Sequence, residues 1–198
     1  MRKLLGIFII TLLWLATVNA QVYKYVDEKG IVNYSTEKPK QYRYKTLTFP
    51  CYVGDPKCRK VDWENIPLNY QSFANIIEQA AQSYQVDEAL VRAIIHAESA
   101  FQPDAKSPRG AQGLMQLIPA NQPRYGISDP YHPGQNIYGG TQHLAELLEE
   151  FEGDVERVLA AYNAGANAVW KYDGIPPYEE TQEYVRRVKI LHRRYAGG

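Results

Sequence analysis

The strongest constraint on this chain is an apolar helical stripe that ends in a carboxylate. Between Ala89 and Ser99, apolar residues recur every three or four positions, as on one face of an α-helix, and Glu98 follows on the same face. The apolar positions are Leu90, Val91, Ile94 and Ile95. Burial disfavours the charged form of a carboxyl, so a glutamate held there should have a raised pKa, as a general acid needs. Spacing alone leaves open that the stripe stops one turn earlier and that Glu98 points to water.

Helical spacing continues through most of the later sequence. Phe73 to Tyr84 has the pattern of one amphipathic helix, and Asp87 is a suitable N-cap for the helix that carries Glu98. Further helices are predicted over residues 137–151, 155–164 and 184–191, with a short one over 113–118 that Pro119 stops. Asp154 is expected to cap one of them, and Gly165 to follow its end. The pattern indicates an all-α domain.

The first twenty residues differ in kind from the rest. Arg2 and Lys3 precede an almost wholly apolar run from Leu4 to Leu15, and small residues then lead to Ala20. This is the pattern of a secretory signal peptide over residues 1–20, and its apolar run is short for a membrane span. We therefore expect an exported protein, with an uncleaved anchor as the alternative.

Export bears on the two cysteines, Cys51 and Cys58. Disulfides persist outside the cytoplasm, so we predict that these residues pair. Closing so short a loop would stabilise the fold by roughly 2.5 kcal/mol on the chain-entropy account, a gain that strain could erase. Two free thiols are the alternative.

A small β module is predicted over residues 21–58. Val22 to Val26 and Ile31 to Tyr34 are β-prone runs on either side of a short turn that ends in Gly30, which indicates a hairpin. Residues 42–49 alternate well enough for a third strand. The stretch resembles a small β module of unknown function at the front of many exported bacterial proteins. It is the candidate contact for partner proteins of the cell envelope.

Prolines and charges then mark a linker, which we set at residues 59–67, before a larger domain over 68–198. An apolar content of 45% is sufficient for a real core in that domain. The net charge is zero, and a nucleic-acid-binding protein would normally carry a basic face. We expect no nucleic-acid partner.

Five short motifs follow one another in the larger domain. They are Glu98-Ser99, the segment from Ser107 to Pro119 that contains Gly113-Leu-Met-Gln116, Gln135-Asn136-Ile137, Ala161-Tyr-Asn-Ala-Gly165 and Tyr184-Val185. Their order and spacing resemble the catalytic domain of the soluble lytic transglycosylases, lysozyme-like enzymes that cleave peptidoglycan. The chain departs from the pattern at Asn121-Gln-Pro123, where many relatives carry Thr-Ala after the proline.

The resemblance implies a mainly α, lysozyme-like fold and a defined reaction. Peptidoglycan would be cut at the β-1,4 bond between N-acetylmuramic acid and N-acetylglucosamine without water. Glu98 would act first as acid and then as base, and the 6-hydroxyl of the muramoyl sugar would close on C1 to give a 1,6-anhydro end. One carboxylate is then sufficient, because the nucleophile belongs to the substrate.

The resemblance also assigns supporting roles around Glu98. Gly113 would let the backbone approach a sugar closely, and Met115 would form an apolar wall. A hydrogen bond from Tyr162 to Glu98 is our candidate for orienting the carboxyl. The remaining supporting residues are Ser99, Ser107, Gln116, Asn163 and Tyr184. Without the resemblance, Gln116 would be taken for a surface residue, and Met115 and Tyr162 for core residues.

Several alternatives remain at this point. A goose-type lysozyme would hydrolyse the same bond, and an inert domain would only bind peptidoglycan. Asp104 is the nearest downstream carboxylate, but its context predicts a turn. The four histidines lack paired ligand spacing, so we expect no metal and no cofactor. We also expect a monomer in the periplasm or cell envelope, with the basic face of the last helix exposed to solvent.

Overall fold

The computed structural model describes residues 22–28, 32–35, 38–47 and 61–198. The chain divides into two compact units, residues 1–48 and 49–198. The predicted signal peptide and both cysteines of the predicted disulfide, Cys51 and Cys58, lie outside the described residues. Their predictions therefore stand untested by the fold.

The first unit is a small antiparallel sheet. Its strands are β1 (Val22–Val26), β2 (Val32–Ser35) and β3 (Tyr44–Leu47), in the order β2-β1-β3. Tyr25 on β1 lies opposite Asn33 on one side and Tyr44 on the other. The hairpin and the third strand are both confirmed, although β3 is shorter than the predicted stretch.

The second unit is helical, which confirms the mainly α prediction. Its helices are α1 (Ala74–Tyr84), α2 (Glu88–Ser99), α3 (Pro133–Glu150), α4 (Val155–Ala164), α5 (Ala166–Tyr172) and α6 (Glu179–Ala196), with a short 3-10 helix, η2 (Gln122–Tyr125). The predicted caps are present: the Asp87 carboxylate accepts from the Ala89 amide, and that of Asp154 accepts from the amides of residues 156 and 157. In the described parts of the chain, every helix is too short or too polar to cross a lipid bilayer.

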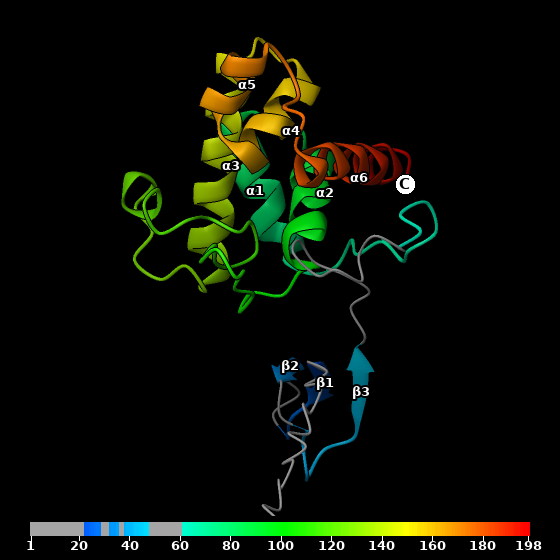
Figure 1. Ribbon diagram of the computed structural model, residues 1–198. Coiled ribbons are helices and arrows are strands. Elements are labelled where there is room, and N and C mark those ends of the chain that lie inside the picture. The colour runs from blue at the N-terminus through cyan, green and yellow to red at the C-terminus, as the bar shows by residue number, and fades with distance from the viewer. Residues whose placement is uncertain (1–21, 29–31, 36–37, 48–60) are drawn as a thin grey trace, which may run out of the picture. The chain divides into compact units, whose positions relative to one another are not determined.

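Helix α2 is the centre of this unit. It packs between α1 and α6, and Figure 1 shows it inside the group of helices. Every residue from Leu90 to Ser99 is buried, so the apolar stripe predicted from the sequence does face the core. The carboxylate that ends the stripe is buried with it.

Part of the predicted linker belongs to this helical core, so that boundary was wrong. Trp63 is 3% exposed and Ile66 is 7% exposed, and both pack in the main hydrophobic cluster. Arg194 on α6 donates hydrogen bonds to the backbone carbonyls of both residues, at 2.7 Å each. Exposed proline and charged residues made this segment resemble a linker in the sequence, although Trp63 anchors it to the helices.

Candidate active site

Glu98 lies in the last turn of α2 and is only 5% exposed. The helix ends at the next residue, Ser99, because Ala100 takes a left-handed conformation, with φ of 50°. The carboxyl is thus held by the rigid end of a buried helix, where side-chain positions are well defined. This confirms the buried location rather than a solvent-facing one.

Burial raises the pKa of Glu98 from its ordinary value of 4.5 to about 7. Two neighbours on α6 act in the opposite direction: the Tyr184 hydroxyl and the Arg187 guanidinium both favour the carboxylate and lower this pKa. Glu180, on the first turn of α6, raises it slightly as a like charge. The balance leaves a carboxyl group that keeps its proton close to neutral pH.

Tyr184 is the tyrosine that faces Glu98. Its side chain is fully buried, and its pKa is raised well above its ordinary value, first by burial and then by the Glu98 charge. The hydroxyl has no hydrogen-bond partner of standard geometry, although it interacts with the Glu98 carboxyl. The contact is therefore longer or less well aligned than an ordinary hydrogen bond.

Tyr162 has a different role from the one that we predicted. Its hydroxyl donates to the backbone carbonyl of Met115, at 2.9 Å, and not to Glu98. The side chain still lies near the acid, because the Glu98 charge adds to burial in raising the pKa of Tyr162. The candidate hydrogen bond was wrong because sequence spacing gave the helix face of Tyr162 but not the partner across from it.

The loop of residues 105–118 contains no helix, so the predicted short helix over 113–118 was wrong. Gln112 forms isolated antiparallel bridges with Lys106 and Leu117. The chain turns sharply because Gly113 and Gln116 both have positive φ, 78° and 51°. A helix cannot continue through such conformations.

Asn136 on α3 fixes this loop. Its amide nitrogen donates to the carbonyls of Gln112 and Pro130, at 3.0 and 2.9 Å, and its oxygen accepts from the Met115 amide, at 2.7 Å. A β-carbon on Gly113 would lie 2.2 Å from the Asn136 amide nitrogen. It would lie equally close to the Pro130 carbonyl oxygen, so packing within the loop already requires glycine at this position.

Other predicted site residues support the loop and the helix end. The Gln116 amide donates to the carbonyls of Ala105 and Gly113, at 3.2 and 2.9 Å. The Ser107 hydroxyl accepts from the Ala111 amide, and the buried Ser99 hydroxyl donates to the Ile95 carbonyl. Met115 is fully buried, so its side chain forms core instead of the predicted apolar wall.

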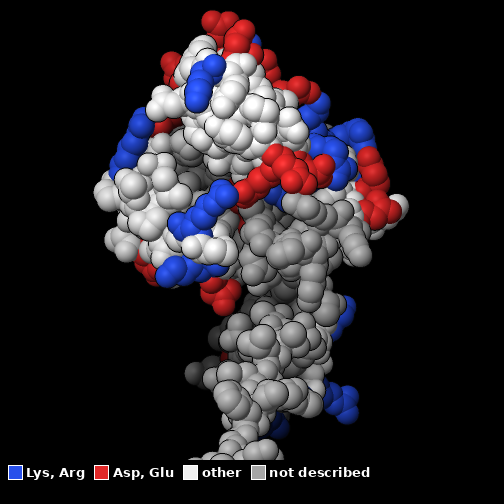
Figure 2. Space-filling model, viewed as in Figure 1, with Lys and Arg blue, Asp and Glu red and all other residues white. Residues whose placement is uncertain are grey.

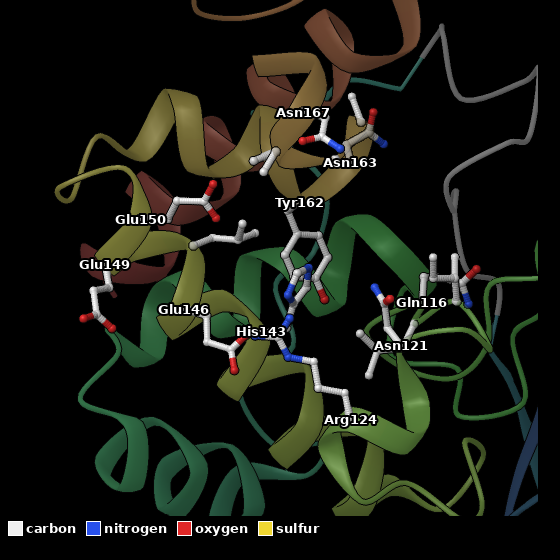
Figure 3. Close-up of a pocket in the computed structure, with 17 residues that line it drawn as sticks. Gln116, Asn121, Arg124, His143, Glu146, Glu149, Glu150, Tyr162, Asn163 and Asn167 are labelled. Atoms are coloured by element: carbon white, nitrogen blue, oxygen red, sulfur yellow. Dashed lines mark ion pairs between the residues drawn. The ribbon is translucent and has the colours of Figure 1, made fainter. Parts of the chain in front are cut away.

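A pocket of about 950 Å³ opens beside this loop. Gln116 and Ile118 line it on the loop side, while Tyr162 and Asn163 line it from α4 (Figure 3). Asn163 also accepts a hydrogen bond from Thr181, at 2.8 Å, which ties α4 to α6. Glu98 is not among the lining residues, so the pocket adjoins the buried acid without including it.

The far wall of the pocket comes from α3 and η2. Figure 3 shows His143 below the Tyr162 ring, with Arg124 and Glu146 beside it. The Tyr125 hydroxyl lies 2.8 Å from His143 Nδ1 and donates to Glu146, at 3.0 Å. Burial lowers the pKa of His143, so this ring is neutral near pH 7.

The segment 121–123, where the chain departs from the pattern of many relatives, also lies at this pocket. Asn121 lines it, and the Gln122 side chain donates hydrogen bonds to the Gln112 side chain and to the Leu117 carbonyl.

Three important residues were missed by sequence reasoning. Asn136 was quoted only as part of a motif, Trp63 was placed in a linker, and Arg187 was counted among solvent-facing cations. For Asn136, an Asn within the apolar face of a helix is a usable signal, because a buried amide needs partners. For Arg187, the signal is its place three residues after Tyr184 and four before Leu191, on the buried face of the last helix. Arg186 and Lys189 form surface ion pairs with Glu183 and Glu156.

The sequence pattern of the Transglycosylase SLT domain family matches residues 75–185. This chain belongs to that family. The match begins in α1 and ends in α6, so it includes Glu98, the loop around Gln116, Tyr162 and Tyr184.

Known proteins of similar sequence and structure agree with this assignment. The chain is 43% identical to a transglycosylase of Enterobacteria phage PRD1, over 46% of this chain and 34% of that protein. It is 30% identical to the soluble lytic murein transglycosylase of Salmonella typhimurium, over 67% and 24%. The lytic transglycosylase Slt of Pseudomonas aeruginosa, solved as an inactive glutamate-to-glutamine mutant, superposes with a TM-score of 0.57 at 28% identity, over 62% of this chain and 24% of that one.

The family's SLT domain is thus the shared part of otherwise different proteins. This chain covers about a third of the phage protein and about a quarter of the Salmonella protein. The likeness lies in the helical unit, where the family match falls.

Proposed function

We propose that this protein is a lytic transglycosylase. It cleaves the β-1,4 bond between N-acetylmuramic acid and N-acetylglucosamine in peptidoglycan and leaves 1,6-anhydro ends. Family membership supports the activity class, and the relatives in Salmonella and Pseudomonas carry it in their names. The observation that carries the proposal is Glu98, the one buried acid in the described part of the chain, with a pKa of about 7.

The first half of the reaction uses Glu98 as a general acid. Its proton passes to the glycosidic oxygen, and the bond between that oxygen and C1 of the muramoyl sugar breaks. A carboxyl with an ordinary pKa would already be ionised at neutral pH, whereas Glu98 keeps its proton because it is buried. The last turn of α2 holds it in one place for this transfer.

The second half uses the same group as a general base. The Glu98 carboxylate takes the proton of the muramoyl 6-hydroxyl, and that oxygen bonds to C1. Glu98 ends with a proton again, and no water is consumed. The Pseudomonas protein supports an essential glutamate in this reaction, because one glutamate-to-glutamine change leaves it inactive.

The other carboxylates near this site suit structural tasks better than a second catalytic role. Glu180 forms an ion pair with Arg109 in the loop, at 2.9 Å, and so links α6 to the segment that contains Ser107. Asp104 lies exposed on a turn. Most glycosidases need a second carboxylate to activate water or attack the sugar, and a substrate nucleophile removes that need.

The pocket beside Glu98 suits a hydroxyl-rich chain. Amides of Gln116, Asn121 and Asn163 line it together with the exposed side chain of Ile118, and charged side chains line its far wall. On the face that Figure 2 shows, acidic and basic side chains are mixed over the helical unit. We propose that Gln116 and Asn163 contact the sugars nearest the cut, while Ser99, Ser107, Gly113 and Met115 support the loop and helix that hold them.

We further propose export to the bacterial cell envelope, where peptidoglycan lies, after removal of residues 1–20. The β module would then sit ahead of a catalytic domain that starts near residue 61, since Trp63 packs with the helices. Partner binding by the module and a monomeric state remain predictions.

The experiment is digestion of purified peptidoglycan with the parent protein and with Glu98→Gln, followed by mass spectrometry of the released fragments. We expect anhydro products, one water lighter than hydrolysis products, from the parent and a loss of at least about 1,000-fold in the variant. Glu78→Gln, an exposed change on α1 away from the pocket, is the matched control. Reducing-end products would establish the goose-type hydrolase instead, and no products would leave a peptidoglycan-binding protein.

A further inference from the structure

Arg187 is the one arginine on α6 whose charge is directed into the core beside the acid. Its side chain is 7% exposed, and its guanidinium lies 5.3 Å from the centre of the Tyr184 ring and 5.9 Å from that of Trp63. The Nε atom is buried without a hydrogen-bond partner. Its neighbours Arg186 and Lys189, in contrast, are exposed and paired with surface carboxylates.

Such a placement is costly for stability. A buried charge that is incompletely hydrogen-bonded loses hydration that it does not recover within the protein. Stacking on two aromatic rings returns part of this loss, because their faces are electronegative. A methionine of similar length would fill the same space without the charge, so the charge itself needs an explanation.

The groups around Arg187 connect it to the acid. From α6, Tyr184, Glu180 and Glu183 interact with it, and from α2 the Glu98 carboxyl does so. Tyr184 precedes Arg187 by three residues, so the two share one face of α6. The Tyr184 hydroxyl faces Glu98 and its ring faces the guanidinium, while Tyr162 on α4 lies near the same carboxyl.

We propose that Arg187 is a positioning residue that, together with Tyr184, stabilises the carboxylate form of Glu98 during the second half of the reaction. The inference rests on the proposed function and deepens it. Once Glu98 has given its proton to the glycosidic oxygen, a negative charge exists in a site where water is excluded. The permanent charge of Arg187, which lies against the Tyr184 ring and interacts with Glu98, can offset it.

The strength of this coupling suits a group that must be both acid and base. An opposite charge within about 4–6 Å lowers a carboxyl pKa by roughly 1–3 units, which would remove most of the shift that burial gives Glu98. Arg187 lowers the pKa of Glu98 by less than burial raises it, and this leaves an acid that titrates near pH 7. Trp63 also lies against the guanidinium, which is buried and little screened by water.

The test compares Arg187→Met with Arg187→Lys, and uses Arg186→Met on the exposed neighbouring position as the control. Release of anhydro fragments is followed from pH 4 to 9. For Arg187→Met we expect kcat to fall about tenfold with little change in KM, because the stabilised charge exists only after substrate is bound. The alkaline limb of the profile should move upward by about half to one unit. Arg187→Lys should keep most of the parent's kcat and an alkaline limb close to the parent's. Arg186→Met should match the parent in both quantities.

A direct titration of Glu98 by carbon-13 NMR separates this inference from the proposed function, since it needs no activity. We expect a higher Glu98 pKa in Arg187→Met than in the parent or in Arg187→Lys. Arg187→Gln is a second neutral variant should the methionine variant fold poorly, as thermal unfolding would reveal. An unchanged Glu98 pKa in a folded neutral variant would overturn the inference, even in an active enzyme. A parent without anhydro products would instead refute the proposed function, while the titration still decides the coupling.

Discussion

The two sides of the active site are built in opposite ways. Where α2 meets α6, Glu98, Tyr184 and Arg187 are buried, the Tyr184 hydroxyl and the Arg187 Nε atom have no hydrogen-bond partner, and the pKa of the acid is shifted strongly upward. On the loop and α3 side, Asn136 and Gln116 have their amides satisfied by backbone carbonyls. One side holds the reacting charge in an unfavourable environment, and the other holds the loop rigid.

This difference indicates where stability and catalysis compete. Polar groups that are fully hydrogen-bonded stabilise the fold, so removing them should cost free energy of unfolding. Groups that are buried without full compensation destabilise the fold, so neutralising them should raise stability while activity falls. Substitutions on the two sides should therefore change stability in opposite directions.

The largest effect is expected for Asn136→Ala. Loss of its amide leaves the Met115 amide and the Pro130 carbonyl without their partner, while the Gln112 carbonyl keeps only the Leu117 amide. We expect a loss of roughly 3–5 kcal/mol in the free energy of unfolding, measured by urea denaturation, because each unsatisfied buried group costs about 1–3 kcal/mol. Asn167→Ala, at an exposed position that also lines the pocket, is the control and should change stability by less than about 0.5 kcal/mol. A loss no larger than the control's would show that the loop does not depend on Asn136.

On the α2–α6 side, Glu98→Gln is expected to raise the free energy of unfolding, by an amount that depends on pH. Below pH 4.5 the folded and unfolded parent are both protonated at Glu98, so the pKa shift has no effect on stability. As pH rises, the unfolded chain ionises first, and the folded state loses stability until its own pKa of about 7 is passed. Glutamine does not ionise, so the variant does not lose this stability. Its free energy of unfolding should exceed that of the parent by up to about 3 kcal/mol at pH 8 and by little at pH 4.

Urea denaturation at both pH values measures this difference. Glu149→Gln, at an exposed position, should follow the parent at each pH within about 0.5 kcal/mol. If Glu98→Gln were equally stable relative to the parent at pH 4 and pH 8, the acid would not be held in the protonated form by the fold.

The smallest effect is expected for Tyr162→Phe. The change removes one hydrogen bond, from the hydroxyl to the Met115 carbonyl, and keeps the ring. A loss of about 1 kcal/mol in thermal or urea unfolding is expected. Tyr138→Phe on α3 serves as the tyrosine control. A much larger loss of activity than of stability would return Tyr162 to the catalytic role that the sequence first suggested.

The sequence predicted the helices correctly but not the loop. Asp87 and Asp154 were predicted as caps, and α2 as a buried helix, because these depend on residues within a few positions of one another. The segment 113–118 was predicted as helix from its apolar content, but Asn136 on a distant helix holds it in turns. Trp63 and Arg187 were wrongly expected to be exposed, because charged residues flank both of them in the sequence. Their burial depends on contacts between the start of the helical unit and α6.

The sequence by itself therefore determined that Glu98 ends the apolar face of a helix, because helical periodicity acts locally, but it left open whether that carboxyl is buried. Tertiary structure decided its burial, and also which tyrosine hydroxyl and which arginine lie near it. Tyr162 and Tyr184 are both aromatic residues in family motifs, and only the packing of α6 against α2 and α4 directs one hydroxyl to Met115 and the other toward Glu98. Such contacts join residues far apart in the chain, and no spacing rule within one helix specifies them.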